Sequence, residues 1–355
     1  MKLNSLLIVA LATVTFAITD ASASYKSWNE YYSNAETLMA DGRIPEALRF
    51  AKRSVIESRD RHGEQTINTF KSLELQAELT KASGNYKRAV KLQSDAYDLV
   101  KRIKGSDDPK TINSQCRLAQ LSTLAGNLKT GEAYYRDALA TCQAGNRQGC
   151  ITIAEPMIGL AQVLASEGNY PEAEKLYLSA IDRFCCFSKY RAALKLKMAA
   201  AFEGLGAMSE NSGDYSKAAG CLRNSVKIYR SQSVVPQEQL GQTLLSLGNA
   251  YSKLGKPERS LKCYKEALGI FEYNGKASPS SLGLVFKGLG DIYRSKGNLK
   301  LAANNYKKAV TQLQTVAFVG RPLFAETIRS LSEVYQEMGM ETESQMVQSK
   351  LMAMN

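Results

Sequence analysis

The stretch GNYKRAVKLQSDAYDL, residues 84–99, decides the fold because it recurs along the chain. GNLKTGEAYYRDALAT follows at residues 126–141 and GNYPEAEKLYLSAIDR at residues 168–183, each starting 42 residues after the one before. Related stretches extend the series in both directions, and they begin at Gly42, Gly213, Gly255, Gly297 and Gly339. One step is 45 residues and every other step is 42, so the series defines eight units. A fixed period of this length predicts a repeat architecture.

Each unit has the pattern of two amphipathic helices. Apolar residues precede the glycine at spacings of three and four, as in Phe286, Leu289 and Tyr293. A small, an aromatic and a second small residue follow it, as in the segment 302–309. The glycine tolerates the left-handed conformation that ends a helix. A helical hairpin of this size buries its apolar face only by stacking on its neighbours, so the pattern predicts an all-α solenoid.

These residues resemble the tetratricopeptide repeat (TPR). The family pattern occurs as LAQVLASEGNYPEAEKLYLSAI at residues 160–181 and as LGDIYRSKGNLKLAANNYKKAV at residues 289–310. The 42-residue period, in place of the usual 34, is similar to the kinesin-light-chain type. The resemblance implies a right-handed TPR α-solenoid of about eight helix-turn-helix repeats over residues 24–355. The expected repeats are approximately 28–69, 70–111, 112–153, 154–198, 199–240, 241–282, 283–324 and 325–355.

Three places depart from the regular pattern. The first unit has Ile44 in place of the turn tyrosine of the family pattern, and the last unit, GMETESQ, lacks the small-aromatic-small triplet. Both departures suit capping units that face water. The single 45-residue step places three extra residues near RFCCFSKYRAALKLK, residues 183–197. This insertion predicts a lengthened helix or loop between the fourth and fifth units.

The N-terminus has the features of a secretory signal. Lys2 precedes an uncharged run that ends before Asp20, and the small residues Ala21-Ser22-Ala23 follow. The apolar centre, residues 6–18, is short for a hydrocarbon core of ~30 Å. We therefore predict a signal peptide over residues 1–23 with cleavage after Ala23, and an exported protein, periplasmic or secreted, of a bacterial type. The mature chain then has no transmembrane span. The alternative is an uncleaved anchor.

The net charge is strongly positive. The chain has 46 basic and 34 acidic residues, a formal charge of +12. This balance favours acidic partners or anionic surfaces. No basic run interleaved with aromatics and no recognised nucleic-acid module occurs, so no nucleic-acid partner is expected. A solvated basic surface is the alternative to any specific partner.

The sequence offers little for catalysis or cofactors. Its one histidine, His62, falls between the first two units, and no second histidine completes a metal site or triad. No phosphate-cradling glycine-rich loop occurs, since the glycines follow the repeat period. We therefore expect no enzyme activity, no cofactor and no metal.

Seven cysteines raise the question of disulfides. No Cys-x-x-Cys pair supports zinc binding, and Cys221 and Cys263 are 42 residues apart in neighbouring units. Helices pack ~8–10 Å apart, whereas a disulfide joins Cα atoms within about 7 Å, so these two are not expected to pair. Cys142 and Cys150 bracket a short turn, and an oxidising compartment would allow a bridge between them. The alternative is that all seven are buried thiols.

The resemblance also implies a function. TPR arrays commonly bind an extended or helical segment of another protein along the concave surface lined by the first helices. If Leu289 and Gly290 are buried, the residue two after the leucine points inward, and neighbours three or four away share its face. The expected peptide groove consists of Arg117, Gln120, Gln162, Asn249, Lys253, Lys287, Asp291, Arg294 and Arg329. The alternative for each residue is a solvated face.

Charge is concentrated in the sixth and seventh units. Residues 241–282 have six basic and three acidic side chains, and residues 283–324 have seven and one. Lys253, Lys287 and Arg294 are therefore expected to attract an acidic segment. The sequence predicts an exported, non-catalytic scaffold for a protein or peptide partner. The alternative is an envelope-associated structural protein that docks on an anionic lipid, glycan or polymer through a basic face, and steep salt dependence would distinguish it.

Overall fold

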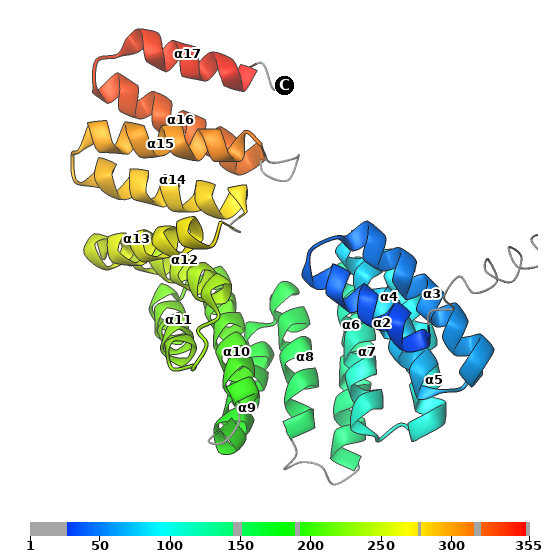
Figure 1. Cartoon of the computed structure of the whole chain (residues 1–355). Coiled ribbons are helices and arrows are strands. Elements are labelled where there is room, and N and C mark those ends of the chain that lie inside the picture. The colour runs from blue at the N-terminus through cyan, green and yellow to red at the C-terminus, as the bar shows by residue number, and fades with distance from the viewer. Residues whose placement is uncertain (1–26, 145–150, 189–191, 276–277, 316–320, 353–355) are drawn as a thin grey trace, which may run out of the picture. The chain divides into compact units, whose positions relative to one another are not determined.

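The chain folds into helical hairpins. The computed structural model describes residues 27–144, 151–188, 192–275, 278–315 and 321–352, and within these ranges it has sixteen α-helices, one short 3₁₀ helix and no strand (Figure 1). Each first helix pairs with the helix that follows it across a short turn. The predicted all-α architecture is confirmed. The predicted signal peptide, with its cleavage site at Ala23, lies outside the described residues.

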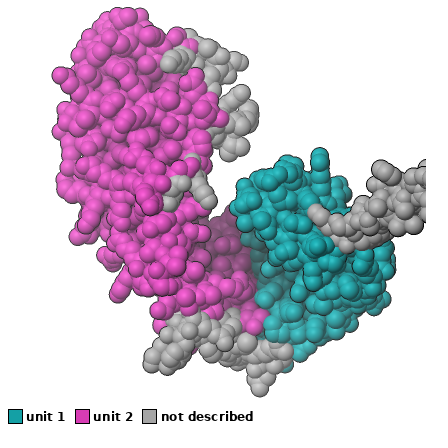
Figure 2. All heavy atoms as spheres, viewed as in Figure 1, with its two compact units in different colours: residues 1–148 teal, residues 149–355 magenta. Residues whose placement is uncertain are grey.

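The chain divides into two compact units, residues 1–148 and residues 149–355 (Figure 2). Unit 1 contains three hairpins: α2 (Trp28–Ala40) with α3 (Ile44–His62), α4 (Ile67–Ala82) with α5 (Tyr86–Lys104), and α6 (Pro109–Leu124) with α7 (Leu128–Ala144). Unit 2 begins with η1 (Ile151–Ile153) and contains five hairpins: α8 (Ala154–Ser166) with α9 (Tyr170–Ser188), α10 (Ala192–Asn211) with α11 (Tyr215–Arg230), α12 (Gln237–Lys253) with α13 (Pro257–Asn274), α14 (Pro279–Ser295) with α15 (Leu299–Leu313), and α16 (Arg321–Glu337) with α17 (Glu341–Met352). One continuous solenoid over residues 24–355 stays a prediction.

The periodic glycines end the first helices as predicted. Gly84 has a φ of 80°, its N–H donates to the carbonyl of Lys81, and the N–H of Asn85 donates to the carbonyl of Thr80. This pair of bonds satisfies carbonyls that the end of the helix would otherwise leave open. The Asn85 side chain then accepts from the N–H of Arg88 and starts α5. Positive φ recurs at Gly42, Gly126, Gly168, Gly213, Gly255, Gly297 and Gly339.

The small-aromatic-small triplet packs the hairpins. Ala302, Tyr306 and Ala309 of α15 are all fully buried. A Cβ on Gly290 of α14 would lie 2.6 Å from the Tyr306 ring, so the glycine is what lets the aromatic side chain reach the facing helix. In unit 1, Leu79 of α4 belongs to one buried cluster with Ala47 and Ala51 of α3.

The 45-residue step is accommodated in part by a longer helix. α10 has 20 residues, whereas the equivalent α12 and α14 have 17 each. The structure thus agrees with the predicted lengthening between the fourth and fifth repeats. α10 contributes residues to the candidate site described below.

Candidate functional site

The candidate site lies on the first helices of unit 2. These helices (α8, α10, α12, α14 and α16) present a polar side to solvent, which we call the first-helix face. Two tyrosines of the second helices reach this face. The Tyr264 hydroxyl donates to Asn249 Oδ1 at 2.6 Å, and the Tyr306 hydroxyl donates to Asp291 Oδ1 at 2.6 Å. Each bond holds a polar side chain at the position that the sequence predicted to point inward.

The two tyrosine hydroxyls are firmly protonated. Burial raises the pKa of Tyr264, and burial together with the neighbouring Asp291 carboxylate raises the pKa of Tyr306. Both hydroxyls therefore remain donors, and each leaves its partner with further lone pairs to accept from a ligand.

Charged residues of α14 pair with α16. Lys287 Nζ lies 3.0 Å from a carboxylate oxygen of Asp291 and 3.0 Å from one of Glu326. Burial disfavours the charged ammonium, but Asp291 and Glu326 together raise the pKa of Lys287. Arg294 binds Glu333 at 2.6 Å and Glu337 at 2.5 Å. The sequence predicted Lys287 and Arg294 as cations for an acidic ligand, whereas the structure pairs both of them within the protein.

The other predicted groove residues fall into two groups. In unit 1, Arg117 and Gln120 of α6 are exposed, and Arg117 pairs with Glu74 of α4 at 3.2 Å. In unit 2, Gln162 of α8, Lys253 of α12 and Arg329 of α16 are exposed. The groups belong to different compact units. Unit 2 is therefore the part that brings most of the predicted residues onto one face.

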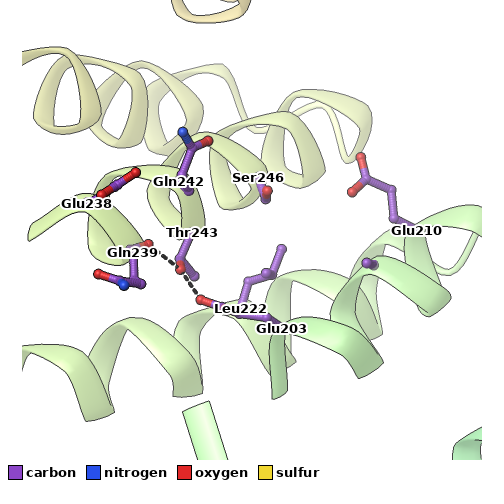
Figure 3. A pocket seen from close by; sticks show the side chains of 9 residues that line it. Glu203, Glu210, Leu222, Glu238, Gln239, Gln242, Thr243 and Ser246 are labelled. Carbon is purple, nitrogen blue, oxygen red and sulfur yellow. Dashed lines mark hydrogen bonds between the residues drawn. The ribbon is translucent and has the colours of Figure 1, made fainter. Parts of the chain in front are cut away.

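A cavity opens between α10, α11 and α12. Its volume is about 380 Å³. It is lined by Glu203, Ala207, Glu210, Leu222, Glu238, Gln239, Gln242, Thr243 and Ser246 (Figure 3). None of these nine residues was among the predicted groove residues. The cavity is the main feature that the sequence prediction missed.

The cavity has an acidic lining on an apolar base. Glu203 accepts hydrogen bonds from the Thr243 hydroxyl and, at 3.2 Å, from the Ser225 hydroxyl. Burial raises the pKa of Glu210, and Lys253 opposes that shift. Figure 3 shows Glu238 and Glu210 at opposite ends of the cavity, with Glu203 and Leu222 between them. No lysine or arginine is among the lining residues.

The remaining candidates from the sequence are the metal-ligating side chains, His62 and the cysteines. The described ranges contain no group of three or more His, Cys, Asp or Glu side chains placed to hold a metal ion. His62 is the last residue of α3, a correction to its expected place between units, and its ring lies edge-on to Trp28. Cys221 and Cys263 are buried, free thiols, as expected, and burial raises the pKa of Cys263 to about 11. Cys142 is buried in α7, but Cys150 lies outside the described residues, so their disulfide stays a prediction.

Comparisons with known proteins identify the class. The stacked hairpins with periodic turn glycines define a helical-repeat protein, a class that includes protein-interaction scaffolds. Models of the tetratricopeptide repeat match residues 68–144, 197–272 and 288–312, which together cover half of the chain. The chain belongs to the tetratricopeptide-repeat family. A search of curated proteins finds no sequence relative.

Solved structures share the fold at low sequence identity. The apo quorum sensor NprR from B. thuringiensis is 12% identical with a TM-score of 0.63, and the match covers 99% of this chain and 95% of that one. BtubC (BKLC) from P. vanneervenii is 20% identical with a TM-score of 0.56, covering 66% and 93%. A Rap protein complexed with Competence and Sporulation Factor is 13% identical with a TM-score of 0.54, covering 92% and 96%. At these identities the likeness concerns the fold alone.

No helix within the described ranges combines the length and apolar character needed to cross a bilayer.

Proposed function

We propose that this chain is an exported, non-catalytic scaffold that binds a segment of another protein on the first-helix face of unit 2. The observation that carries the proposal is the cavity of about 380 Å³ between α10, α11 and α12. Asn249 and Asp291, whose side chains are already held by Tyr264 and Tyr306, add fixed acceptors on the first helices. Side chains that are ordered before binding lose less entropy when a ligand arrives. The cavity supplies a concave surface, and the fixed acceptors supply orientation.

The chemistry of the face suits a polypeptide ligand. Asn249 and Asp291 lie at equivalent positions of neighbouring repeats and can accept from backbone N–H groups. Gln239 and Gln242 line the cavity with amides that both donate and accept. The solved Rap protein of the same fold is complexed with Competence and Sporulation Factor, which supports a search for a partner of this kind.

Export is part of the proposal. The basic start, the short apolar run and the Ala21-Ser22-Ala23 site support it. Intact-mass measurement of material from the exported fraction should find a chain that begins at Ser24. Exported protein that still carries Met1 would contradict cleavage.

Site-specific photo-crosslinking tests the binding face. A photoreactive amino acid is placed at Gln242, which lines the cavity, or at Lys265, which is exposed on α13. The chain that carries the photoreactive residue is mixed with the exported fraction of its own cells and irradiated. Crosslinked adducts are then identified by mass spectrometry. We expect one protein partner attached at position 242 and not at position 265. Attachment at 265 alone would place binding on the second helices and contradict the proposal.

A further inference from the structure

The cavity exists because one repeat departs from its neighbours at two matched positions. Ala207 is 42 residues before Asn249, and Asn249 is 42 residues before Asp291. Leu222 stands in the same relation to Tyr264 and Tyr306. The sixth and seventh repeats therefore carry a hydrogen-bonded pair at the place where the fifth repeat has alanine and leucine. Both exceptional residues line the cavity.

The missing pair accounts for the open volume. In the sixth repeat the Tyr264 ring fills the space between α12 and α14, since Cβ atoms on Gly248 and Gly288 would lie 2.7 and 2.5 Å from it. In the fifth repeat the Leu222 side chain is shorter than the equivalent Tyr264 and lacks the outer part of the ring and the hydroxyl. Ala207, at the position of Asn249, has no polar group to accept a hydrogen bond. The space that the tyrosine and its partner would occupy is left open between α10 and α12.

The charge of this space is negative. Glu203, Glu210 and Glu238 line it, and Glu203 is held in place by the Thr243 hydroxyl. Lys253 of α12 is exposed and acts on Glu210 from outside the lining set. This arrangement contrasts with α14, where the cations Lys287 and Arg294 are paired with acids of α16.

We infer that this cavity receives a basic, lysine- or arginine-bearing segment of the partner protein, in an extended conformation. The inference rests on the proposed function and reverses the charge that the sequence predicted for the ligand. The aliphatic stem of a lysine can lie on Leu222 and Ala207 while its ammonium reaches Glu203 or Glu210. The chemistry of the lining thus matches both parts of a basic side chain.

The spacing of the acidic residues along the helices suits an extended segment of several residues. Glu238 lies fourteen positions before Ser252, the residue of α12 equivalent to Glu210. At a rise of 1.5 Å per helical residue, this offset corresponds to ~21 Å along the helices. An extended chain advances ~3.3 Å per residue, so about six residues span the distance. Basic side chains at alternate positions of such a segment would face the same acidic wall.

Fluorescence anisotropy with the chain 24–355 tests this inference. The probe is a labelled peptide of about eight residues in which lysine alternates with alanine, and the comparison peptide has glutamate in place of lysine. We expect the lysine peptide to bind and the glutamate peptide not to bind. The double variant Glu203→Gln/Glu210→Gln should weaken binding about tenfold, or ~1.4 kcal/mol. The matched control Glu272→Gln/Glu341→Gln removes two exposed acids elsewhere and should change binding less than about twofold.

A second variant separates shape from charge. Ala207→Asn/Leu222→Tyr restores the pair found in the sixth repeat, fills the cavity and keeps all three carboxylates. It should weaken the lysine peptide at least about tenfold, with unchanged helicity by circular dichroism. Ser246 is at the position equivalent to Gly288, so a tyrosine at position 222 could crowd its side chain. If that variant fails to fold, Ala207→Gln, at an exposed position of α10, obstructs the cavity without the tyrosine.

Two results would overturn the inference. One is equal binding of the lysine and glutamate peptides. The other is lysine-peptide binding that neither the charge variant nor the cavity-filling variant weakens. If the natural partner still crosslinks at position 242 while the lysine peptide fails to bind, the ligand class is wrong and the proposed function stands. Absence of any partner at position 242 overturns the proposed function itself.

Discussion

The fifth and seventh repeats share one register and differ in what they do with it. In the seventh, Asp291 accepts from Tyr306 and pairs with Lys287, which also reaches Glu326 in the next repeat. In the fifth, the two equivalent positions are Ala207 and Leu222, and an acid-lined cavity takes the place of the network. The same backbone thus carries either a hydrogen-bonded and ion-paired network between repeats or an open cavity, depending on the side chains at two positions. Departures from a repeat are therefore as informative as the repeat.

The largest expected effect on stability comes from breaking the ion pairs of Lys287 and Arg294 in the seventh repeat. Lys287→Glu/Arg294→Glu places new negative charges against Asp291, Glu326, Glu333 and Glu337. Because Lys287 is largely buried, we expect the free energy of unfolding to fall by roughly 2–3 kcal/mol. Chemical denaturation measures it.

The control for this reversal is Lys253→Glu, at an exposed position. It should cost less than about 1 kcal/mol. Stability unchanged by the double reversal would show that the α14–α16 pairs contribute nothing and that both cations are available to a ligand.

Glycine replacement sharpens the contrast between a filled and an open repeat. At Gly248 a Cβ would lie 2.7 Å from the Tyr264 ring, whereas at Gly206 it would lie 3.0 Å from Leu222. Leu222 borders the cavity and has room to shift, and alanine is favoured over glycine inside a helix by roughly 0.5–1 kcal/mol. Gly248→Ala should therefore destabilise by about 1–2 kcal/mol, and Gly206→Ala should be neutral or stabilising. Equal melting temperatures for the two variants would refute the difference in packing.

Alkaline pH should loosen the seventh repeat. Tyr306, through burial and the Asp291 charge, has a raised pKa, and the pKa of Lys287 is also raised. The stability that each contributes is complete below the pKa of the unfolded chain, about 10, and is lost as the pH rises through the folded value. Absorbance titration should show a set of tyrosines that ionise only as helicity falls above pH ~10. Tyr306→Phe should shrink that set, and ionisation of every tyrosine near pH ~10 with helicity intact would contradict the raised pKa.

The sequence predicted the repeats well because they depend on local rules. The glycine period requires a left-handed residue at each turn, and every predicted turn glycine has positive φ. The rule of two residues after the buried leucine located Asn249 and Asp291, since side-chain direction follows from helical periodicity.

The ion pairs of the face could not be predicted in the same way. Arg294 meets Glu333 and Glu337, 39 and 43 residues away, and these contacts depend on how far one repeat is rotated on the next. A count of basic residues in the sixth and seventh repeats therefore overstated the charge available to a ligand.

The sequence signal for the cavity is the absence of a polar residue and a tyrosine from two positions of the fifth repeat. Ala207 occupies the position at which the sixth and seventh repeats carry Asn249 and Asp291, and an alanine has no polar group that would indicate a site. Its partner Leu222, 42 residues before Tyr264, carries the second half of the signal. The structure adds what the sequence does not show, that Ala207 and Leu222 line the same cavity.

Methyl NMR of the chain 24–355 tests the central claim, that the open fifth repeat is the binding site, most directly. The methyl groups of Ala207 and Leu222 line the cavity and report on its occupation, whereas those of Leu313 and Leu331 report on the α15–α16 region. Addition of the lysine-alanine peptide should shift the Ala207 and Leu222 signals and leave the Leu313 and Leu331 signals in place. Shifts confined to Leu313 and Leu331, or no shift at Ala207 and Leu222 with the peptide bound, would contradict the claim.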